Sequence, residues 1–174
     1  SGCLGLGGDH ITNDLSVVLK VPMAKAEKLK IEEGSVAFDA TEVEGVIDLE
    51  AGSHFAGGKV EKSLVNQVIT MRTREILGLV YKRLASTGHL NRVGKGIYLT
   101  GGSSLLDGIE ELAAEVFGLP VQRGGVSSMT GPAAIFEKPQ YSTPVGLVRY
   151  AQLLDEQRPR RGRIKAIGQK VAGI

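Results

Sequence analysis

The chain has 174 residues, 42% of them hydrophobic and 23% charged, which is typical of a globular domain. Aromatic residues account for only 5% and tryptophan is absent, which argues against carbohydrate or nucleic-acid sites that depend on stacking rings. The formal net charge is only +2, the lone Cys3 excludes an internal disulfide, and no apolar run approaches the roughly 20 residues that a membrane-spanning helix needs.

The first two elements are expected to be helices. Asp9 is the candidate N-cap of the first helix, which ends at Pro22. The apolar residues of this helix fall on one face: Ile11, Leu15, Val18 and Leu19. The second helix covers residues 23–34, and Gly34 is expected to be its C-cap.

Short strands and a long helix follow. Three segments have the pattern of strands separated by polar or glycine-rich turns: 35–38, 42–49 and 57–63. Residues 64–86 give the clearest helix of the chain. Its broad apolar side is traced by Leu64, Val68, Met71, Ile76, Leu79 and Leu84.

The second half of the chain alternates strands and helices. The expected elements are a strand over 97–102, a helix over 105–117, a strand over 119–124, a long loop over 125–142 and a helix over 143–154. This order is typical of an α/β fold, so we expect a parallel or mixed sheet interrupted by a small insertion of strands and a helix.

Several kinds of chemistry have no motif in the chain. The three histidines, His10, His54 and His89, lie far apart and none belongs to a ligand-spaced pair, so a metal site is not expected. A nucleophile elbow, a Walker A loop and a clean dinucleotide-binding glycine motif are also missing from the sequence.

The paired glycines Gly101 and Gly102 follow an apolar run and precede a helix-like pattern. In an open α/β sheet, ligands bind at the carboxyl ends of strands, and glycines let a ligand approach the backbone. A tight turn is the alternative explanation. Ser104 and Asp107 resemble a capping box, and a carboxylate there would repel a phosphate. A nucleotide held by this turn is therefore expected to present its base or sugar.

Four segments together resemble the FtsA family of actin-like bacterial cell-division proteins: "GLGGDHITNDL", "AEKLKIEEG", "IYLTGGSSLLDGIEELAAEVFGLPV" and "YSTPVGLVRYA". They occur in the family's order over roughly residues 2–152, and the wider matches favour FtsA over the filament protein MreB or the pilus protein PilM. The resemblance implies an actin-like (ribonuclease H-like) ATPase lobe, with a mixed sheet and helices, whose partner lobe lies upstream.

The same resemblance divides the chain into four parts. It implies that residues 1–21 begin the core subdomain of the second lobe, that 22–95 form an inserted α+β subdomain, that 96–153 return to the core, and that 154–174 form a basic tail.

The resemblance also implies that ATP and magnesium bind between the two lobes. It assigns Gly101, Gly102 and Ser103 to a turn that holds the adenosine. It assigns Glu27 and Lys30 to the ribose and base, and it places Gly7, Gly8 and Asp9 near the phosphates and magnesium. The alternatives are an ordinary surface ion pair for Glu27 and Lys30, and a tight turn with a cap for residues 7–9.

A partner site is implied on the long helix, which in FtsA docks the C-terminal peptide of the tubulin-like FtsZ. "VITMRTREIL" resembles that helix and puts Arg72 in the place of a peptide-binding arginine, with Lys62 and Arg74 as possible neighbours. An arginine can grip a carboxylate through two hydrogen bonds. The alternative is a solvated arginine on an amphipathic helix.

The tail carries six basic residues and no acidic one from Arg158 onward. One helical stripe of the tail contains Ile164, Ile167, Val171 and Ile174. A basic amphipathic helix is typical of binding to a membrane surface, and FtsA proteins carry a short C-terminal anchor of this kind. Gly168 and Gly173 weaken the helix, so the segment is expected to be a truncated anchor or a linker to it.

The resemblance therefore implies an ATP-binding adaptor, not an enzyme, that tethers the FtsZ ring to the inner face of the cytoplasmic membrane. It would self-associate into actin-like filaments and meet other division proteins, with no nucleic-acid partner. Because no general base is identifiable, we expect negligible ATP hydrolysis by this chain. The alternatives are an MreB- or PilM-like filament or scaffold protein, a small-molecule kinase of the same superfamily, and a docking module that binds no nucleotide.

Overall fold

The computed structural model describes residues 1–36, 44–52, 55–125 and 138–157. Its elements in chain order are α1 (Gly8–Leu19), α2 (Met23–Glu32), β1 (Val46–Leu49), β2 (Gly58–Glu61), α3 (Lys62–Ser86), the 3-10 turn η1 (Leu90–Arg92), β3 (Ile97–Leu99), the 3-10 turn η2 (Gly102–Leu105), α4 (Ile109–Phe117), β4 (Val121–Arg123), the 3-10 turn η3 (Pro139–Tyr141) and α6 (Ser142–Gln157). The elements match the α/β class predicted from the sequence.

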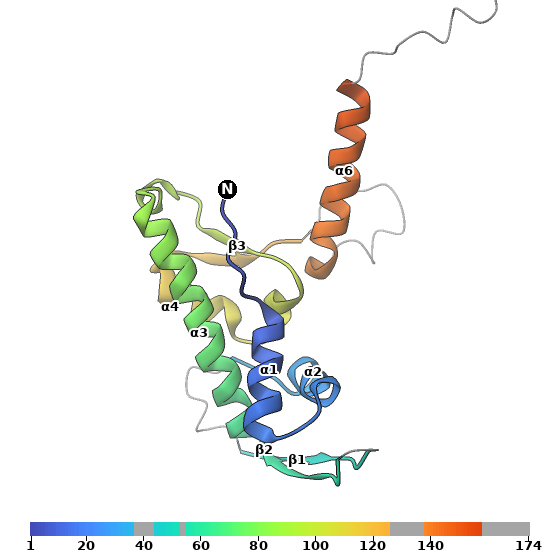
Figure 1. Cartoon of the computed structure of the whole chain (residues 1–174). Helices are drawn as coiled ribbons and strands as arrows, with labels where there is room; N and C mark the ends of the chain where they lie inside the picture. Colours follow the sequence, from blue (N-terminus) through green and yellow to red (C-terminus); the bar gives the residue numbers. More distant parts are fainter. Residues whose placement is uncertain (37–43, 53–54, 126–137, 158–174) are drawn as a thin grey trace, which may run out of the picture.

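Helix α1 lies between α2 and α3 and contacts both of them (Figure 1). The β1–β2 hairpin lies at one end of these helices, and β3 lies toward the other (Figure 1). One continuous apolar core joins α1, α3 and α4 and includes Leu15, Ile69 and Leu112. The subdomain boundary predicted after residue 21 therefore does not separate two apolar cores. The division of the chain into subdomains stays a prediction.

In the described part of the chain the strands form two separate two-stranded sheets, where a parallel or mixed sheet interrupted by a small insertion of strands and a helix was expected. Strands β1 and β2 pair antiparallel, with Val46 opposite Glu61, and β3 and β4 pair parallel, with Ile97 opposite Val121. Of the strand predicted over 35–38, Ser35 makes an isolated parallel bridge with Asp107. The rest of that prediction extends into residues 37–43, outside the described ranges.

The start and the face of α1 differ from the sequence prediction. Gly7, not Asp9, is the N-cap, and its backbone N–H donates to His10 Nδ1 at 3.3 Å. Asp9 lies in the first helical turn, where a carboxylate suits the positive end of the helix. The helix buries Ile11 and Leu15, but Val18, which was predicted to lie on the same apolar face, is 49% exposed.

Gly34 is not the C-cap that the sequence suggested, since α2 ends at Glu32 and its C-cap is Glu33, with φ −120°. Glycine is required at this position because the backbone of residue 34 lies close to Lys30 of α2 and Ile69 of α3. A Cβ at Gly34 would lie 2.5 Å from the Lys30 carbonyl oxygen and 2.6 Å from Ile69 Cδ1. The glycine therefore lets α2 and α3 pack closely.

The buried face of α3 is shifted from the predicted one. The helix buries Val65, Asn66, Ile69, Thr73 and Leu77. Leu64 and Met71, which were predicted to face the core, are 37% and 68% exposed. The shift arises because α3 packs against α1 on one side and α4 on the other, so the face includes polar positions. The buried Asn66 side chain accepts a hydrogen bond through Oδ1 from the backbone N–H of Ser35, at 3.0 Å.

Arg74 and Glu115 join α3 to α4 through two hydrogen bonds of 2.6 and 3.0 Å. The two bonds from Arg74 hold the pKa of Glu115 below its ordinary value, against a small burial effect, and the charge of Arg74 adds to the lowering. The pair is about half exposed, so its contribution to the stability of the fold is small.

This pair makes stability depend on pH in a defined direction. A lowered folded pKa stabilises the fold above the unfolded glutamate pKa of about 4.3, and this stabilisation is lost as pH falls through the folded value. The Glu115→Gln variant is therefore expected to melt at a lower temperature than the parent at pH 7, and the difference is expected to shrink below about pH 4. Circular-dichroism melts across pH 3–7 check this, and a constant difference would contradict it.

Helix α6 extends away from the other helices (Figure 1). Val145 is its buried residue, and Leu147 and Tyr150 are more than 60% exposed. Within the described ranges, no helix combines the length and the apolar character needed to cross a bilayer.

Candidate functional site

A cavity of about 540 Å³ lies where the start of α1, the end of α2 and the η2 turn meet. Residues from four segments line it: Gly8 and Asp9; Glu27, Lys30, Ile31, Glu32 and Gly34; Gly102, Ser103, Leu105, Leu106 and Asp107; and Gln140. A cavity of this size and mixed lining is typical of small-molecule sites.

Gly8 lies in the wall of this cavity. A Cβ at this position would lie 2.7 Å from Ser103 Oγ and 3.4 Å from Lys30 Nζ. A side chain at position 8 would therefore require the Ser103 hydroxyl to rotate away, whereas the distance to Lys30 Nζ is an ordinary contact. This contact brings together residues that are 95 positions apart in the sequence numbering, 8 and 103.

Glu27 and Lys30 lie on the same face of α2, one turn apart. Lys30 Nζ donates to Glu27 Oε2 at 2.6 Å, to Thr12 Oγ1 at 2.8 Å and to the Gly8 carbonyl at 3.3 Å. The Thr12 hydroxyl also hydrogen-bonds to Glu27 Oε2. The side chain of Lys30 is only 10% exposed, whereas that of Glu27 is 42% exposed. Because the pair joins α2 to the start of α1, it is more than a solvated surface ion pair.

Burial raises the pKa of Glu27, but the hydrogen bonds and the positive charge around its carboxylate together outweigh that effect. Hydrogen bonds from Lys30 and Thr12, together with the charge of Lys30, lower the pKa of Glu27 below its ordinary value. At neutral pH the cavity therefore presents a carboxylate that accepts hydrogen bonds.

The η2 turn begins at the predicted glycine pair. Gly101 has φ +91°, a conformation that favours glycine, and its N–H donates to the Pro139 carbonyl at 3.1 Å. Ser104 donates to the Gly101 carbonyl at 2.7 Å and does not cap a helix, so the predicted capping box is wrong. Helix α4 starts later, at Ile109, with Gly108 as its N-cap. Asp107 still lines the cavity, so a carboxylate lies near the turn as expected.

Arg72 lies on the side of α3 that faces α1. Its guanidinium donates to both carboxylate oxygens of Asp14, at 2.5 and 3.0 Å, and to Glu75 at 2.6 Å. The hydrogen bonds to Asp14, and then the charges of Asp14 and Glu75, raise the pKa of Arg72 above its ordinary value against a burial effect. Arg72 also lines a second cavity, of about 570 Å³. Its other lining residues are four apolar ones and three polar or acidic ones: Val17, Val18, Val68 and Met71; and Asn13, Asp14 and Glu75.

The two predicted neighbours of Arg72 do not share its surface. Arg74 bonds to Glu115 on α4, and Lys62 Nζ lies 3.0 Å from Glu33 Oε2 after the end of α2. Positions 72 and 74 of a helix point about 200° apart, so Arg72 and Arg74 leave α3 on different sides.

The comparison with protein families is decisive. A family model described as "Cell division protein FtsA" matches residues 1–146. The chain belongs to the FtsA family.

Individual FtsA proteins are similar over most of the chain. The chain is 34% identical over 154 residues to FtsA of Neisseria meningitidis, covering 88% of this chain and 37% of that protein. It is 31% identical over 173 residues to FtsA of Borreliella burgdorferi, covering 98% of this chain and 41% of that protein. The chain thus spans less than half the length of these FtsA relatives.

The actin-like fold predicted from the sequence is confirmed by solved structures. MreB5 of Spiroplasma citri, in a crystal structure described as bound to ADP, aligns with a TM-score of 0.62 and 16% identity. The alignment covers 88% of this chain and 46% of that one. At this identity the likeness shows the fold alone.

Six of the eight residues that the FtsA resemblance assigned to the nucleotide line the first cavity: Gly8, Asp9, Glu27, Lys30, Gly102 and Ser103. Gly7 and Gly101 flank these residues in the chain but are outside the lining. The sequence interpretation missed Gln140, which reaches the cavity from η3, and Thr12, which lies behind it. Gln140 immediately precedes the segment "YSTPVGLVRYA", and that adjacency was the available signal. The tail residues Ile164, Ile167, Val171 and Ile174 lie outside the described ranges.

Proposed function

We propose that this chain is the nucleotide-binding second lobe of an FtsA that couples ATP binding to the tethering of FtsZ. The observation that carries the proposal is the first cavity, because segments distant in the sequence converge there around the glycine contact at Gly8. The family assignment supports the choice of an adenine nucleotide, and no observation favours a kinase or a docking module that binds no nucleotide.

The residues at the cavity fit a nucleoside better than a bare triphosphate. Glu27 offers a carboxylate to ribose hydroxyls, and the glycine turn at Gly102 and Ser103 offers backbone to the adenosine. Asp9, Glu32 and Asp107 also line the cavity and would repel unneutralised phosphates. Following the FtsA resemblance, we propose that the phosphates lie on the side of Gly7, Gly8 and Asp9, where bound magnesium would offset the repulsion from the Asp9 carboxylate.

The direct test is isothermal titration of the whole protein, with its upstream lobe, with magnesium and ATP. A saturable heat supports the proposal, and silence favours the docking module. Phosphoryl transfer to a panel of sugars and acids would favour the kinase alternative. We propose no catalytic role for this chain, so turnover of ATP by the isolated 174 residues would contradict that part.

We further propose that the FtsZ peptide docks beside Arg72. The guanidinium lines the second cavity together with apolar side chains and with its own partners Asp14 and Glu75. A peptide carboxylate would bind Arg72 there by displacing the exposed Glu75, while apolar side chains of the peptide contact the valines of this cavity. The membrane role rests on the basic tail, and filament formation rests on the family alone. Peripheral attachment to the cytoplasmic membrane at the division site follows from these two roles.

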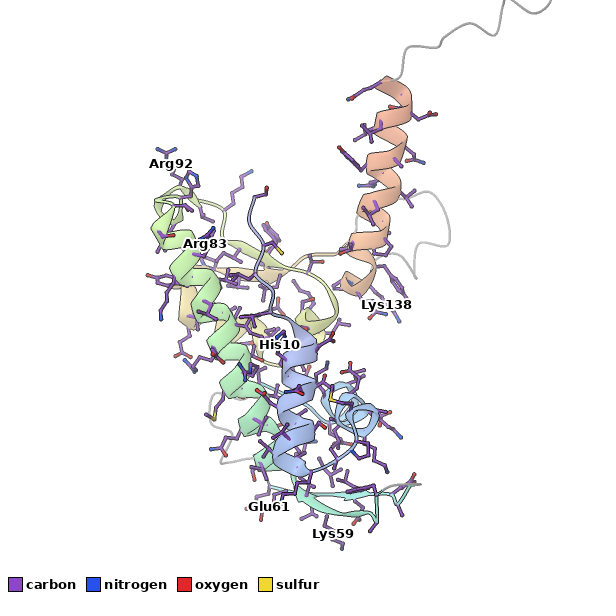
Figure 2. The ribbon with its side chains drawn as sticks, viewed as in Figure 1. His10, Lys59, Glu61, Arg83, Arg92 and Lys138 are labelled. Atoms are coloured by element: carbon purple, nitrogen blue, oxygen red, sulfur yellow. The ribbon has the colours of Figure 1, made fainter. Side chains whose placement is uncertain are left out.

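The Arg72→Gln variant is expected to bind an FtsZ tail peptide about tenfold more weakly, because a hydrogen bond to a charged group contributes about 1.5–3 kcal/mol. Fluorescence anisotropy with a labelled peptide measures this. Arg83→Gln is the matched control, since Arg83 lies farther along α3, toward its C-terminal end (Figure 2). Equal affinities for the parent and the Arg72→Gln protein would refute the docking site.

A further inference from the structure

Thr12 is buried behind the first cavity. It lies on α1, is 3% exposed and is not among the residues that line the cavity wall. Its hydroxyl nevertheless contacts the side chains of two residues that do line it, Glu27 and Lys30, besides the backbone carbonyl of Gly8 one turn earlier in α1. Any effect of Thr12 on a ligand must therefore act through these two side chains.

The direction of each hydrogen bond follows from the chemistry of the groups. The Lys30 ammonium can only donate, so Thr12 Oγ1 accepts from it at 2.8 Å. The hydroxyl then has a single hydrogen to give, and the ionised Glu27 can only accept. Glu27 Oε2 is a closer acceptor than the Gly8 carbonyl, which is 3.1 Å from the hydroxyl. Thr12 thus adds a second link between the cation and the carboxylate, beside the direct bond of 2.6 Å from Lys30 Nζ to Glu27 Oε2.

Lys30 and Glu27 differ in the polar atoms that they leave available to a ligand in the cavity. The three donors of Lys30 are directed at Glu27, Thr12 and the Gly8 carbonyl. Glu27 Oε2 receives two hydrogen bonds, and in the described part of the chain no bond is recorded to Oε1. The available polar atom of this pair is therefore an acceptor, which suits a hydroxyl donor on the ligand.

We propose that Thr12 is a positioning residue that fixes the Glu27 carboxylate, and that this fixed carboxylate makes the site select a ribose over a deoxyribose. The inference rests on the proposed nucleotide function and adds the residue that sets its sugar specificity. A site built to hydrogen-bond a hydroxyl discriminates against analogues that lack it, because its polar groups are then left unpaired.

The experiment compares ATP, 2′-deoxy-ATP and 3′-deoxy-ATP by isothermal titration of the whole protein with magnesium. The parent is expected to prefer ATP over at least one deoxy analogue by about fivefold or more. In Thr12→Val, which keeps the shape and loses the hydroxyl, that preference is expected to fall toward one. Thr12→Ser, which restores the hydroxyl, is expected to recover it.

The outcomes separate the two proposals. If the parent binds no ATP, the proposed function fails. If the parent binds ATP and both deoxy analogues equally well, only the role of Thr12 in sugar specificity is overturned. The same holds if Thr12→Val keeps the full preference for ATP. A merely structural role would weaken ATP and the deoxy analogues alike and leave their ratio unchanged. If Thr12→Val does not fold, Thr12→Ala supplies the same comparison with a smaller side chain.

Discussion

The protein with Gly108 replaced by alanine is expected to be severely destabilised. Gly108 has φ +76°, and a Cβ there would lie 2.0 Å from the backbone carbonyl oxygen of Val36. Val36 N donates to the Asp107 carbonyl at 2.7 Å, so the two backbones are held together and neither can move aside freely. We expect a loss of about 3 kcal/mol, from left-handed strain and the forced backbone shift together.

A loss of this size lowers the melting temperature by roughly 10 °C in a chain of 174 residues, which circular dichroism resolves easily. Gly118→Ala is the matched control. Gly118 has φ +63°, but a Cβ there would meet nothing within 4 Å. It is expected to cost only the left-handed strain, about 1 kcal/mol. Similar melting temperatures for the two variants would show that the contact with Val36 is not what requires glycine.

Replacement of Gly8 by valine is expected to weaken ATP binding, because the new side chain enters the wall of the first cavity. The new side chain would start 2.7 Å from Ser103 Oγ and 3.4 Å from Lys30 Nζ. Because overpacking of this kind costs about 1–3 kcal/mol, we expect the affinity for magnesium and ATP to fall about tenfold to a hundredfold. Isothermal titration of the whole protein measures the change.

Gly5→Val provides the comparison for that variant. Gly5 precedes α1 by three positions, is exposed, and a Cβ there would meet nothing within 4 Å. Its affinity for ATP is expected to match that of the parent. Undiminished binding by the Gly8→Val protein would place the nucleotide away from this cavity and remove the main support for the proposed function.

Local sequence signals located the elements well where one residue type decides the backbone. Pro22 lies between α1 and α2 as expected, although it is the N-cap of α2 and α1 already ends at Leu19 with Lys20 as its left-handed C-cap. Gly118 closes α4 in the left-handed conformation. The paired glycines were correctly read as a turn after a strand, and Gly101 does need a positive φ. These features depend on neighbours a few residues away, so a single sequence carries them.

Local signals failed where two elements compete for one boundary or face. Ser104 and Asp107 have the spacing of a capping box, yet α4 starts only at Ile109 because the chain at Asp107 pairs with Ser35. Met71 belongs to the most apolar-looking stripe of α3, yet it is 68% exposed because α1 and α4 pack on other sides of the helix. Periodicity shows that a helix is amphipathic without showing which of two overlapping stripes its partners will cover.

The sequence by itself determined the family, the α/β class and six of the residues that line the first cavity, because these follow from motifs and short-range backbone preferences. Only the tertiary structure decided that Gly8 lies beside Ser103 and that the three donors of Lys30 all bond to groups of the protein. It also decided that Arg72 and Arg74 face different helices. These are contacts between segments tens of residues apart. Their geometry is set by how α1, α2, α3 and α4 pack around one core, and no local pattern encodes that packing.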